Sequence, residues 1–93
     1  MKYVYTKRDR LDGCYSIPVF AAETPKDLER AHVSFILHNP DKAFEQHLNE
    51  CELCYMGQFH EDLGTFELLD KPEILVDLGP ICEQAKRRYE NVN

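Results

Sequence analysis

Two short apolar runs separated by a polar segment that ends in glycine constrain the fold of this chain most strongly. The runs are Leu53–Phe59 and Thr65–Leu69, and residues 60–64 separate them. This pattern predicts a β-hairpin with a loop of four or five residues, in which Gly64 supplies the positive φ that such loops need. Apolar residues occupy both faces of the first run, which is typical of a strand covered on both sides. We therefore expect the hairpin to lie at the centre of a sheet.

The N-terminal residues predict a second pair of strands. Residues 1–7 alternate with the period of a half-buried strand. Asp12-Gly13 is a turn signal, and the alternation resumes over residues 15–21. Pro18 cannot donate a hydrogen bond to a neighbouring strand, so this second strand is expected at an edge or with a bulge.

A first helix is predicted between residues 24 and 39. Thr24 is a suitable N-cap, Pro25 suits the first helical position, and Asn39-Pro40 ends the helix. Its apolar stripe is expected to pack on the sheet. The stripe consists of Leu28, Ala31, His32, Phe35 and Ile36.

The remaining elements are shorter or less regular. A turn or two of helix is predicted around Ala43, Phe44, His47 and Leu48. After the hairpin, Asp70-Lys71-Pro72 predicts a break, followed by an edge strand or extended chain over residues 73–78. A final helix is predicted to begin at Pro80. One face of that helix is expected to carry Ile81, Ala85, Arg88 and Tyr89.

The order of elements is β-β-α-β-β-α, with the short helical turn before the hairpin. This order predicts an α+β fold, with a small, mostly antiparallel sheet and one or two helices packed on it. The 93 residues are expected to form one domain, 1–93, which is small enough to gain stability from forming a homodimer. No apolar run approaches the ~18 residues of a membrane span, so we expect a soluble protein.

The charge of the chain is unevenly distributed. The formal net charge of −6 argues against attraction of nucleic acid by the whole surface. Residues 1–10 carry +3, residues 86–93 carry +2, and residues 11–85 carry −11. The sequence therefore indicates an acidic body with two basic ends.

The basic ends are the main functional lead. Tyr3 and Tyr5 share a face of the predicted first strand and are placed to stack unpaired bases while nearby cations hold phosphates. The candidate nucleic-acid contacts are Tyr3, Tyr5, Lys7, Arg8, Arg10, Lys86, Arg87 and Arg88. In the alternative interpretation, which the residues alone favour, the tyrosines belong to the core and the charges form a solvated rim.

The cysteines are expected to be reduced thiols, since nothing marks an exported protein. They are Cys14, Cys51, Cys54 and Cys82. The spacing His47-x3-Cys51-x2-Cys54-x5-His60 uses residue types that zinc binds. However, a strand is predicted to begin there, and residues three apart on a strand point to opposite faces. Structural thiols without a metal are therefore the preferred interpretation, and a thioredoxin-type role would need the pair at a helix N-terminus.

The sequence contains no nucleophile elbow, Walker loop, dinucleotide-binding turn or H-E-x-x-H motif. His60-Glu61-Asp62 places a possible base beside two carboxylates, but within a predicted loop these are more simply solvated turn residues. His32 on the helix stripe is more simply a satisfied boundary residue. We expect a non-enzymatic protein without a cofactor.

The hairpin and its surroundings resemble a known family. The run Leu53-Cys54-Tyr55-Met56-Gly57-Gln58-Phe59, a short acidic loop and Gly64-Thr65-Phe66 resemble the LYxLGxFD…TGxF segment of the small nonstructural protein of gokushoviruses, single-stranded DNA phages of the Microviridae. The resemblance extends to Tyr3-x-Tyr5-x-x-Arg8-Asp9, Pro18-x-Phe20, Asn39-Pro40 and Pro72-Glu73-x-Leu75-Val76. It covers residues 3–78, and the final basic helix has no counterpart.

The resemblance implies a non-capsid protein that acts in the host cytoplasm while a circular single-stranded DNA genome is replicated. It implies a DNA-binding accessory factor in single-strand synthesis and packaging, and it supplies no catalytic or ligand residue. The alternative is an interaction module, in which the acidic body binds a host protein or a viral replication or capsid protein.

Overall fold

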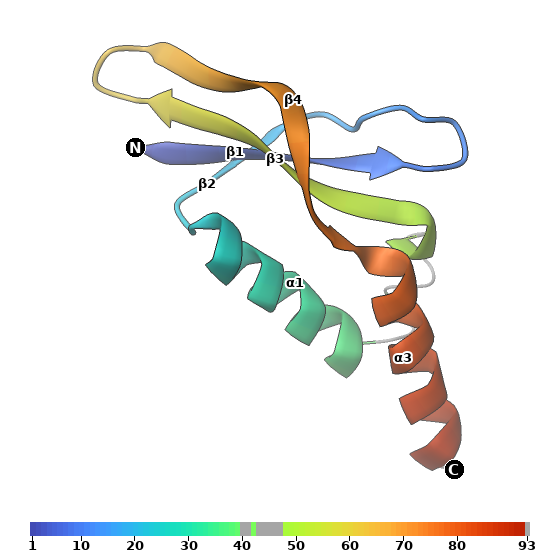
Figure 1. Cartoon of the computed structure of the whole chain (residues 1–93). Coiled ribbons are helices and arrows are strands. Elements are labelled where there is room, and N and C mark those ends of the chain that lie inside the picture. The colour runs from blue at the N-terminus through green and yellow to red at the C-terminus, as the bar shows by residue number, and fades with distance from the viewer. Residues whose placement is uncertain (40–41, 43–47, 93) are drawn as a thin grey trace.

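The computed structural model describes residues 1–39, 42 and 48–92 and contains an antiparallel sheet with helices on one face (Figure 1). The strands are β1 (Lys2–Asp9), β2 (Val19–Ala21), β3 (Cys51–His60) and β4 (Thr65–Asp77), in the spatial order β2-β1-β3-β4. The helices are α1 (Pro25–His38) and α3 (Leu78–Val92), with a short 3-10 helix η1 (Leu48–Glu50) before β3. This arrangement confirms the predicted α+β class.

β1 and β2 pair antiparallel, as predicted, but β2 begins only at Val19. The prediction of a strand from Tyr15 is wrong, because Pro18 has no N–H to donate to β1. Tyr15 instead forms an isolated bridge with Arg8, and the Thr6 hydroxyl donates a hydrogen bond to the carbonyl of Ser16 at 2.8 Å. β2 is an edge strand.

β3 and β4 form the predicted hairpin. His60 pairs with Thr65, and Gly64 in the turn has a φ of 68°. Of the two hairpin strands, β3 is central, since it lies between β1 and β4, whereas β4 is an edge of the sheet. The expectation that the whole hairpin lies at the centre is therefore wrong for its second strand.

β4 runs through the break that was predicted at residues 70–72. Its pairing with β3 jumps from Gly57 opposite Leu68 to Tyr55 opposite Glu73, so residues 69–72 stand opposite Met56 alone. Proline has no backbone N–H to donate to a neighbouring strand. Pro72 is accommodated here because the irregular pairing requires no such hydrogen bond. Figure 1 shows β4 bending sharply along its length before it reaches α3.

Gly57 allows the two strands to approach each other beside the bend. Its φ is +144°, and a Cβ at this position would collide with the carbonyl oxygen of Glu67 and crowd the Cα of Leu68. Only glycine fits such a position without displacing the backbone of the neighbouring strand.

α1 has the predicted termini. The Thr24 hydroxyl accepts a hydrogen bond from the backbone N–H of Asp27 at 3.4 Å, Pro25 occupies the first turn, and Asn39 is the C-cap. The prediction that its apolar stripe packs on the sheet is wrong for most of the stripe. Ile36 is fully buried, but Phe35 is 46 % exposed. α1 packs its C-terminal half mainly against α3 rather than the strands.

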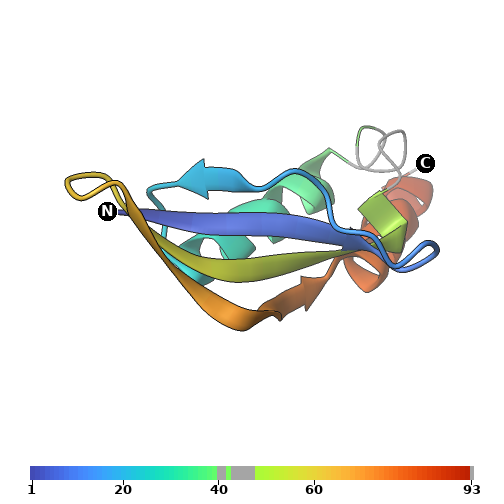
Figure 2. The same cartoon turned by 90° about the horizontal axis from the view of Figure 1, so that it is seen from above.

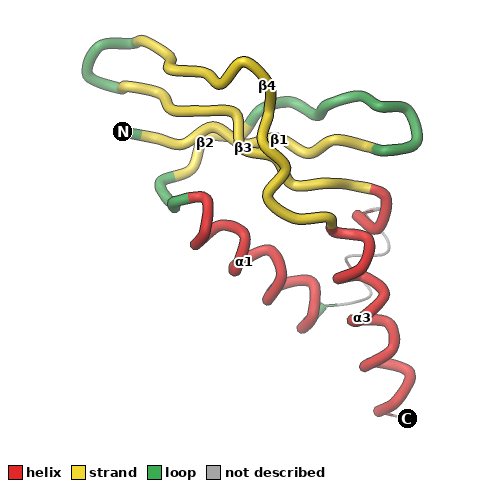
Figure 3. The backbone as a smooth tube through the Cα atoms, in the orientation of Figure 1, coloured by secondary structure: helices red, strands yellow, loops and turns green. Residues whose placement is uncertain are grey.

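The buried residues that join the helices form a cluster that we call the helix core. It consists of Ile36, Leu48, Leu78, Cys82 and Ala85. Figure 3 shows that both helices lie on the same side of the strands, with α3 extending away from them. In the described part of the chain, no helix is long and apolar enough to cross a membrane.

α3 follows β4 without a connecting loop. It begins at Leu78, two residues before the predicted start at Pro80, and the Asp77 carboxylate accepts a hydrogen bond from the Gly79 N–H at 3.0 Å. Its buried face contains Leu78, Cys82 and Ala85. Arg88 and Tyr89 follow Ala85 at helical spacing, as the sequence predicts, but both are exposed. Of the predicted short helical turn, Leu48 starts η1, and residues 43, 44 and 47 lie outside the described residues.

Candidate nucleic-acid interface

The two N-terminal tyrosines occupy different environments. Tyr5 is only 2 % exposed, and its hydroxyl donates a hydrogen bond to the carbonyl of Glu23 at 2.6 Å. Burial, with smaller contributions from Tyr55 and Tyr3, raises the pKa of Tyr5 to about 12. Tyr3 is half-buried, with its ring centroid 6.3 Å from that of Tyr55. The burial of Tyr5 favours the alternative interpretation, in which this tyrosine belongs to the core.

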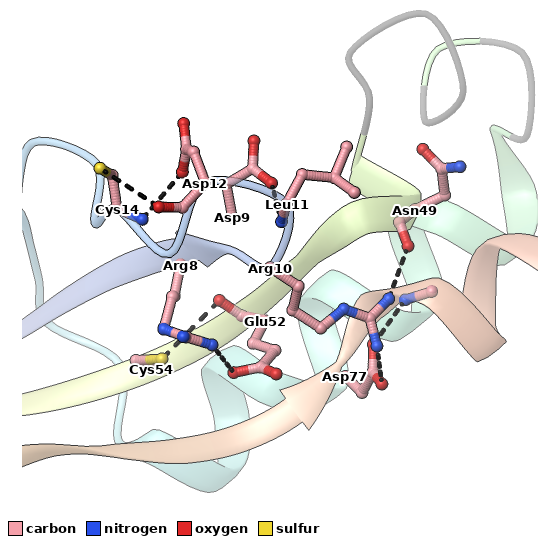
Figure 4. A network of polar contacts seen from close by, with 11 residues as sticks. Arg8, Asp9, Arg10, Leu11, Asp12, Cys14, Asn49, Glu52, Cys54 and Asp77 are labelled. Atoms are coloured by element: carbon pink, nitrogen blue, oxygen red, sulfur yellow. Dashed lines mark hydrogen bonds and ion pairs between the residues drawn. The ribbon is translucent and has the colours of Figure 1, made fainter.

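Arg8 and Arg10 are both paired with carboxylates (Figure 4). Arg8 lies opposite Glu52 in the β1–β3 register, and the two side chains form an ion pair at 3.7 Å. The Arg10 guanidinium contacts the Asp77 carboxylate at 2.6 Å and donates to the carbonyl of Asn49 at 3.1 Å. Arg10 thus ties the end of β1 to η1 and to the start of α3. A phosphate would have to compete with these partners.

The remaining predicted cations lie on other surfaces than Arg8 and Arg10. Lys7 lies between α1 and the sheet, on the face opposite Arg8, since successive side chains of a strand alternate. On α3, Lys86, Arg87 and Arg88 are exposed. They lie roughly 12 to 15 Å along the helix axis from its first residue, at 1.5 Å per residue. The structure therefore does not bring the six predicted cations onto one surface.

Three phenylalanines form an exposed cluster that the sequence reasoning missed. Their ring centroids are 4.8 Å apart for Phe59 and Phe66, 5.5 Å for Phe20 and Phe59, and 6.1 Å for Phe20 and Phe66. Phe20 is 49 % exposed and Phe66 is 52 % exposed. We call Phe20, Phe59 and Phe66 the aromatic cluster. β2, β3 and β4 each contribute one of its rings.

The aromatic cluster lies on the face of the sheet that carries no helix. Tyr5 faces α1, and the neighbouring Val4, which pairs with Phe20, points to the opposite face. Phe59 and Phe66 pair with each other, and Phe59 pairs with Lys2, so these side chains share the face of Val4. Figure 2 looks down on this face, with the helices behind the strands.

The same face continues as an apolar surface along β4. Leu68, which pairs with Gly57, is 54 % exposed, and Ile74 is 57 % exposed. Lys2 stands at the end of this face beside Phe59. The open face can therefore offer flat aromatic rings, with a cation beside them, to a planar ligand.

Cys51, Cys54 and Cys82 have the properties of structural thiols, whereas Cys14 is exposed. Cys54 and Cys82 are fully buried, and burial raises the pKa of both thiols and of half-buried Cys51. A raised pKa keeps a thiol protonated, which disfavours metal binding and nucleophilic attack. Among the described residues no group of three or more His, Cys, Asp or Glu side chains is placed to hold a metal ion. His47 of the zinc hypothesis lies outside them.

His60 and His32 contact different partners. His60 lies 3.3 Å from the Glu67 carboxylate, whereas Glu61 beside it pairs with the N-terminal ammonium at 3.2 Å. A ring nitrogen of His32 lies 3.0 Å from the Leu28 carbonyl, and burial lowers the pKa of this histidine. His32 is thus satisfied by the backbone, whereas the buried Nε2 of His60 makes no hydrogen bond with a described residue.

Comparison with known proteins gives one match. The model of the Phage ORF5 protein family matches residues 2–81, which span the whole sheet, α1 and the start of α3. No curated protein and no solved structure matches the chain. Because the family match covers most of its length, the chain belongs to the Phage ORF5 protein family and is a phage protein.

Proposed function

We propose that this phage protein is a non-enzymatic, nonstructural accessory protein that binds single-stranded DNA on the open face of its sheet. The resemblance to the gokushovirus protein points to the same class, acting in the host cytoplasm during single-strand synthesis and packaging. The observation that carries the proposal is the aromatic cluster, in which three rings lie within stacking range of one another on a face that no described helix covers.

Stacking of bases on the exposed rings would supply most of the affinity. Unpaired bases stack on exposed aromatic side chains, and each such contact contributes about 1 to 3 kcal/mol whatever the base. A four-stranded antiparallel sheet with helices behind it and aromatics on its free face is a known platform for single-stranded nucleic acid. Phe20 and Phe66, each about half exposed, offer such rings.

Charge has a smaller part in this proposal than the sequence alone predicted. The net charge of −6 opposes general attraction of DNA, and Arg8 and Arg10 are engaged by Glu52 and Asp77. The cations left for phosphates include Lys2 beside the aromatic cluster and the exposed basic residues of α3. The affinity should therefore decrease only weakly with salt, because few counterions are released when few phosphates are contacted.

Fluorescence anisotropy with a labelled oligo-dT tests the proposal. We expect Phe66→Ser to weaken binding at least tenfold, because one stacking ring is lost. Phe35→Ser is the matched control, since Phe35 is 46 % exposed but lies on α1. Absence of a complex with the wild-type chain at low salt, or equal losses in both variants, would refute binding by the open face.

A second candidate is an interaction module, and the ion pairs of Arg8 and Arg10 favour it, because they remove two of the predicted phosphate contacts. In this case the acidic body binds a host protein or a viral replication or capsid protein. Pull-down from infected cells separates the two candidates. A specific protein partner that is retained by Phe66→Ser, together with no DNA binding, would favour the module.

A further inference from the structure

A groove lies between α1 and the edge of the sheet formed by β1 and β2, with a volume of about 390 Å³. Its walls are mainly apolar and include Ile17, Val19, Leu28 and Leu53. A second hollow of about 330 Å³ continues it along α1 and shares Lys7, Leu28 and His32 with it. The groove exists because the apolar stripe of α1 is not packed against the strands.

The lining of the groove differs in charge from the rest of this acidic chain. None of the described residues that line either hollow is acidic, although the chain has 17 acidic residues and a net charge of −6. Lys7 lines both hollows and forms no ion pair with any described residue. The groove therefore suits an apolar side chain with a carboxylate next to it, which would pair with the Lys7 ammonium.

The tip of the β3–β4 hairpin has the complementary chemistry. Leu63 is 71 % exposed and follows Glu61 and Asp62. Glu61 pairs with the N-terminal ammonium, whereas Asp62 has no ion-pair partner among the described residues. Figure 1 shows the tip at the far end of the hairpin, beyond both helices. An exposed leucine beside a free carboxylate thus projects from the molecule.

We propose that the protein forms a twofold homodimer in which the hairpin tip of each copy occupies the groove of the other. Leu63 enters the apolar part of the groove, and the Asp62 carboxylate pairs with Lys7 of the second copy. A twofold axis makes the contact twice and closes the assembly, so that no further copy is added. One tip alone is smaller than the ~800 Å² per partner of a standard interface, and the repetition brings the pair closer to that size.

Charge reversal tests the pairing. Lys7→Glu and Asp62→Lys each place like charges at both contacts, and we expect each to weaken dimerisation at least tenfold in analytical ultracentrifugation. An equimolar mixture of the two variants should restore the dimer, because both contacts of the mixed pair are again complementary. Restoration by mixing is specific to a reciprocal contact and would not follow from a variant that fails to fold.

The leucine gives an independent test. Leu63→Ser should also weaken the dimer at least tenfold, whereas Leu11→Ser should leave it unchanged, since Leu11 is 79 % exposed in the other turn. Phe66→Ser should dimerise normally, which separates this inference from the proposed DNA binding. A wild-type chain that stays monomeric, or a dimer that Leu63→Ser does not affect, would overturn the inference. If the wild-type chain is monomeric and its groove binds a foreign acidic peptide, the dimer is refuted and the groove is a binding site for another protein.

Discussion

The two halves of the β3–β4 hairpin differ in what lies behind them. The base, where residues 52–55 pair with residues 73–77, is backed by the helices, and Leu53, on the side of α1, is 2 % exposed. The distal half, where residues 57–60 pair with residues 65–68, extends beyond the helices, and residues 61–71 are all exposed. The irregularity at residues 69–72 separates the two halves.

The comparison indicates a division of roles. The base is held by the helix core, where apolar side chains are removed from water. The distal half is held by backbone pairing and by the aromatic cluster, whose outer rings remain half exposed. Stability should therefore depend mainly on the base, and recognition mainly on the distal half and its tip.

The sharpest test of this division is a pair of leucine truncations. Leu78 is fully buried in the helix core, and Leu78→Ala should lower the free energy of unfolding by about 4 kcal/mol through lost burial and a cavity. Leu68 in the distal half is 54 % exposed, and Leu68→Ala should change the free energy of unfolding by about 0.5 kcal/mol. Urea denaturation followed by circular dichroism measures both. Similar losses in the two variants would contradict the division.

Gly57 is the position in the distal half where a substitution should lower the free energy of unfolding most strongly. Gly57→Ala should cost about 3 kcal/mol, because a Cβ there meets the backbone of β4 at a φ of +144°. Gly64→Ala is the control, with a φ of +68° and open space around it, and should cost about 1 kcal/mol. The same denaturation experiment compares them. Equal costs would show that β4 does not approach Gly57 as closely as described.

Asp77 lies where the base meets α3. Asp77→Ala removes the cap on Gly79 and the ion pair with Arg10, and we expect a loss of about 1.5 kcal/mol. Most of this loss should come from the cap, because the ion pair is more than a third exposed. Asp70→Ala, in the exposed bend of β4, should be neutral. Thermal unfolding at low and high salt measures how much of the stability lost in Asp77→Ala comes from the ion pair, because salt screens the ion pair. We expect this part to be small.

The burial of Tyr5 predicts an effect on stability that appears only at high pH. Its pKa of about 12 lies above the ordinary value of 10, so above pH 10 the unfolded chain loses this proton first. Stability from Tyr5 is complete below pH 10 and should decrease by about 1 kcal/mol per pH unit as the pH rises towards 12. Tyr5→Phe should reduce this slope, and Tyr15→Phe, at an exposed position, should not. An unchanged slope in Tyr5→Phe would contradict its burial.

The local features of the fold could be predicted from the sequence. Thr24-Pro25 determines the start of α1, and Gly64 determines the hairpin turn, because in both cases a few neighbouring residues decide the backbone geometry. The strand through Pro72 could not be predicted. Proline usually interrupts a sheet, and only the edge position and the irregularity of β4 make it acceptable here.

The candidate site was less predictable, because it depends on register and on long-range pairing. The hairpin turn alone sets Phe59 opposite Phe66, but Phe20 joins them only through the pairing of β2 with β1. The ion pairs of Arg8 and Arg10 likewise join residues that are far apart in the sequence. Residue type and spacing identify cations, but they do not reveal which carboxylates the fold places beside them.

The direct passage of β4 into α3 fixes the direction in which the helix leaves the sheet. From Thr65 to Val92 the backbone contains no loop, and its direction changes at the bend of β4 over residues 69–72. Because the Asp77 carboxylate accepts a hydrogen bond from Gly79 in the first turn of α3, the direction of this helix and its exposed basic residues follows that of the base of the hairpin.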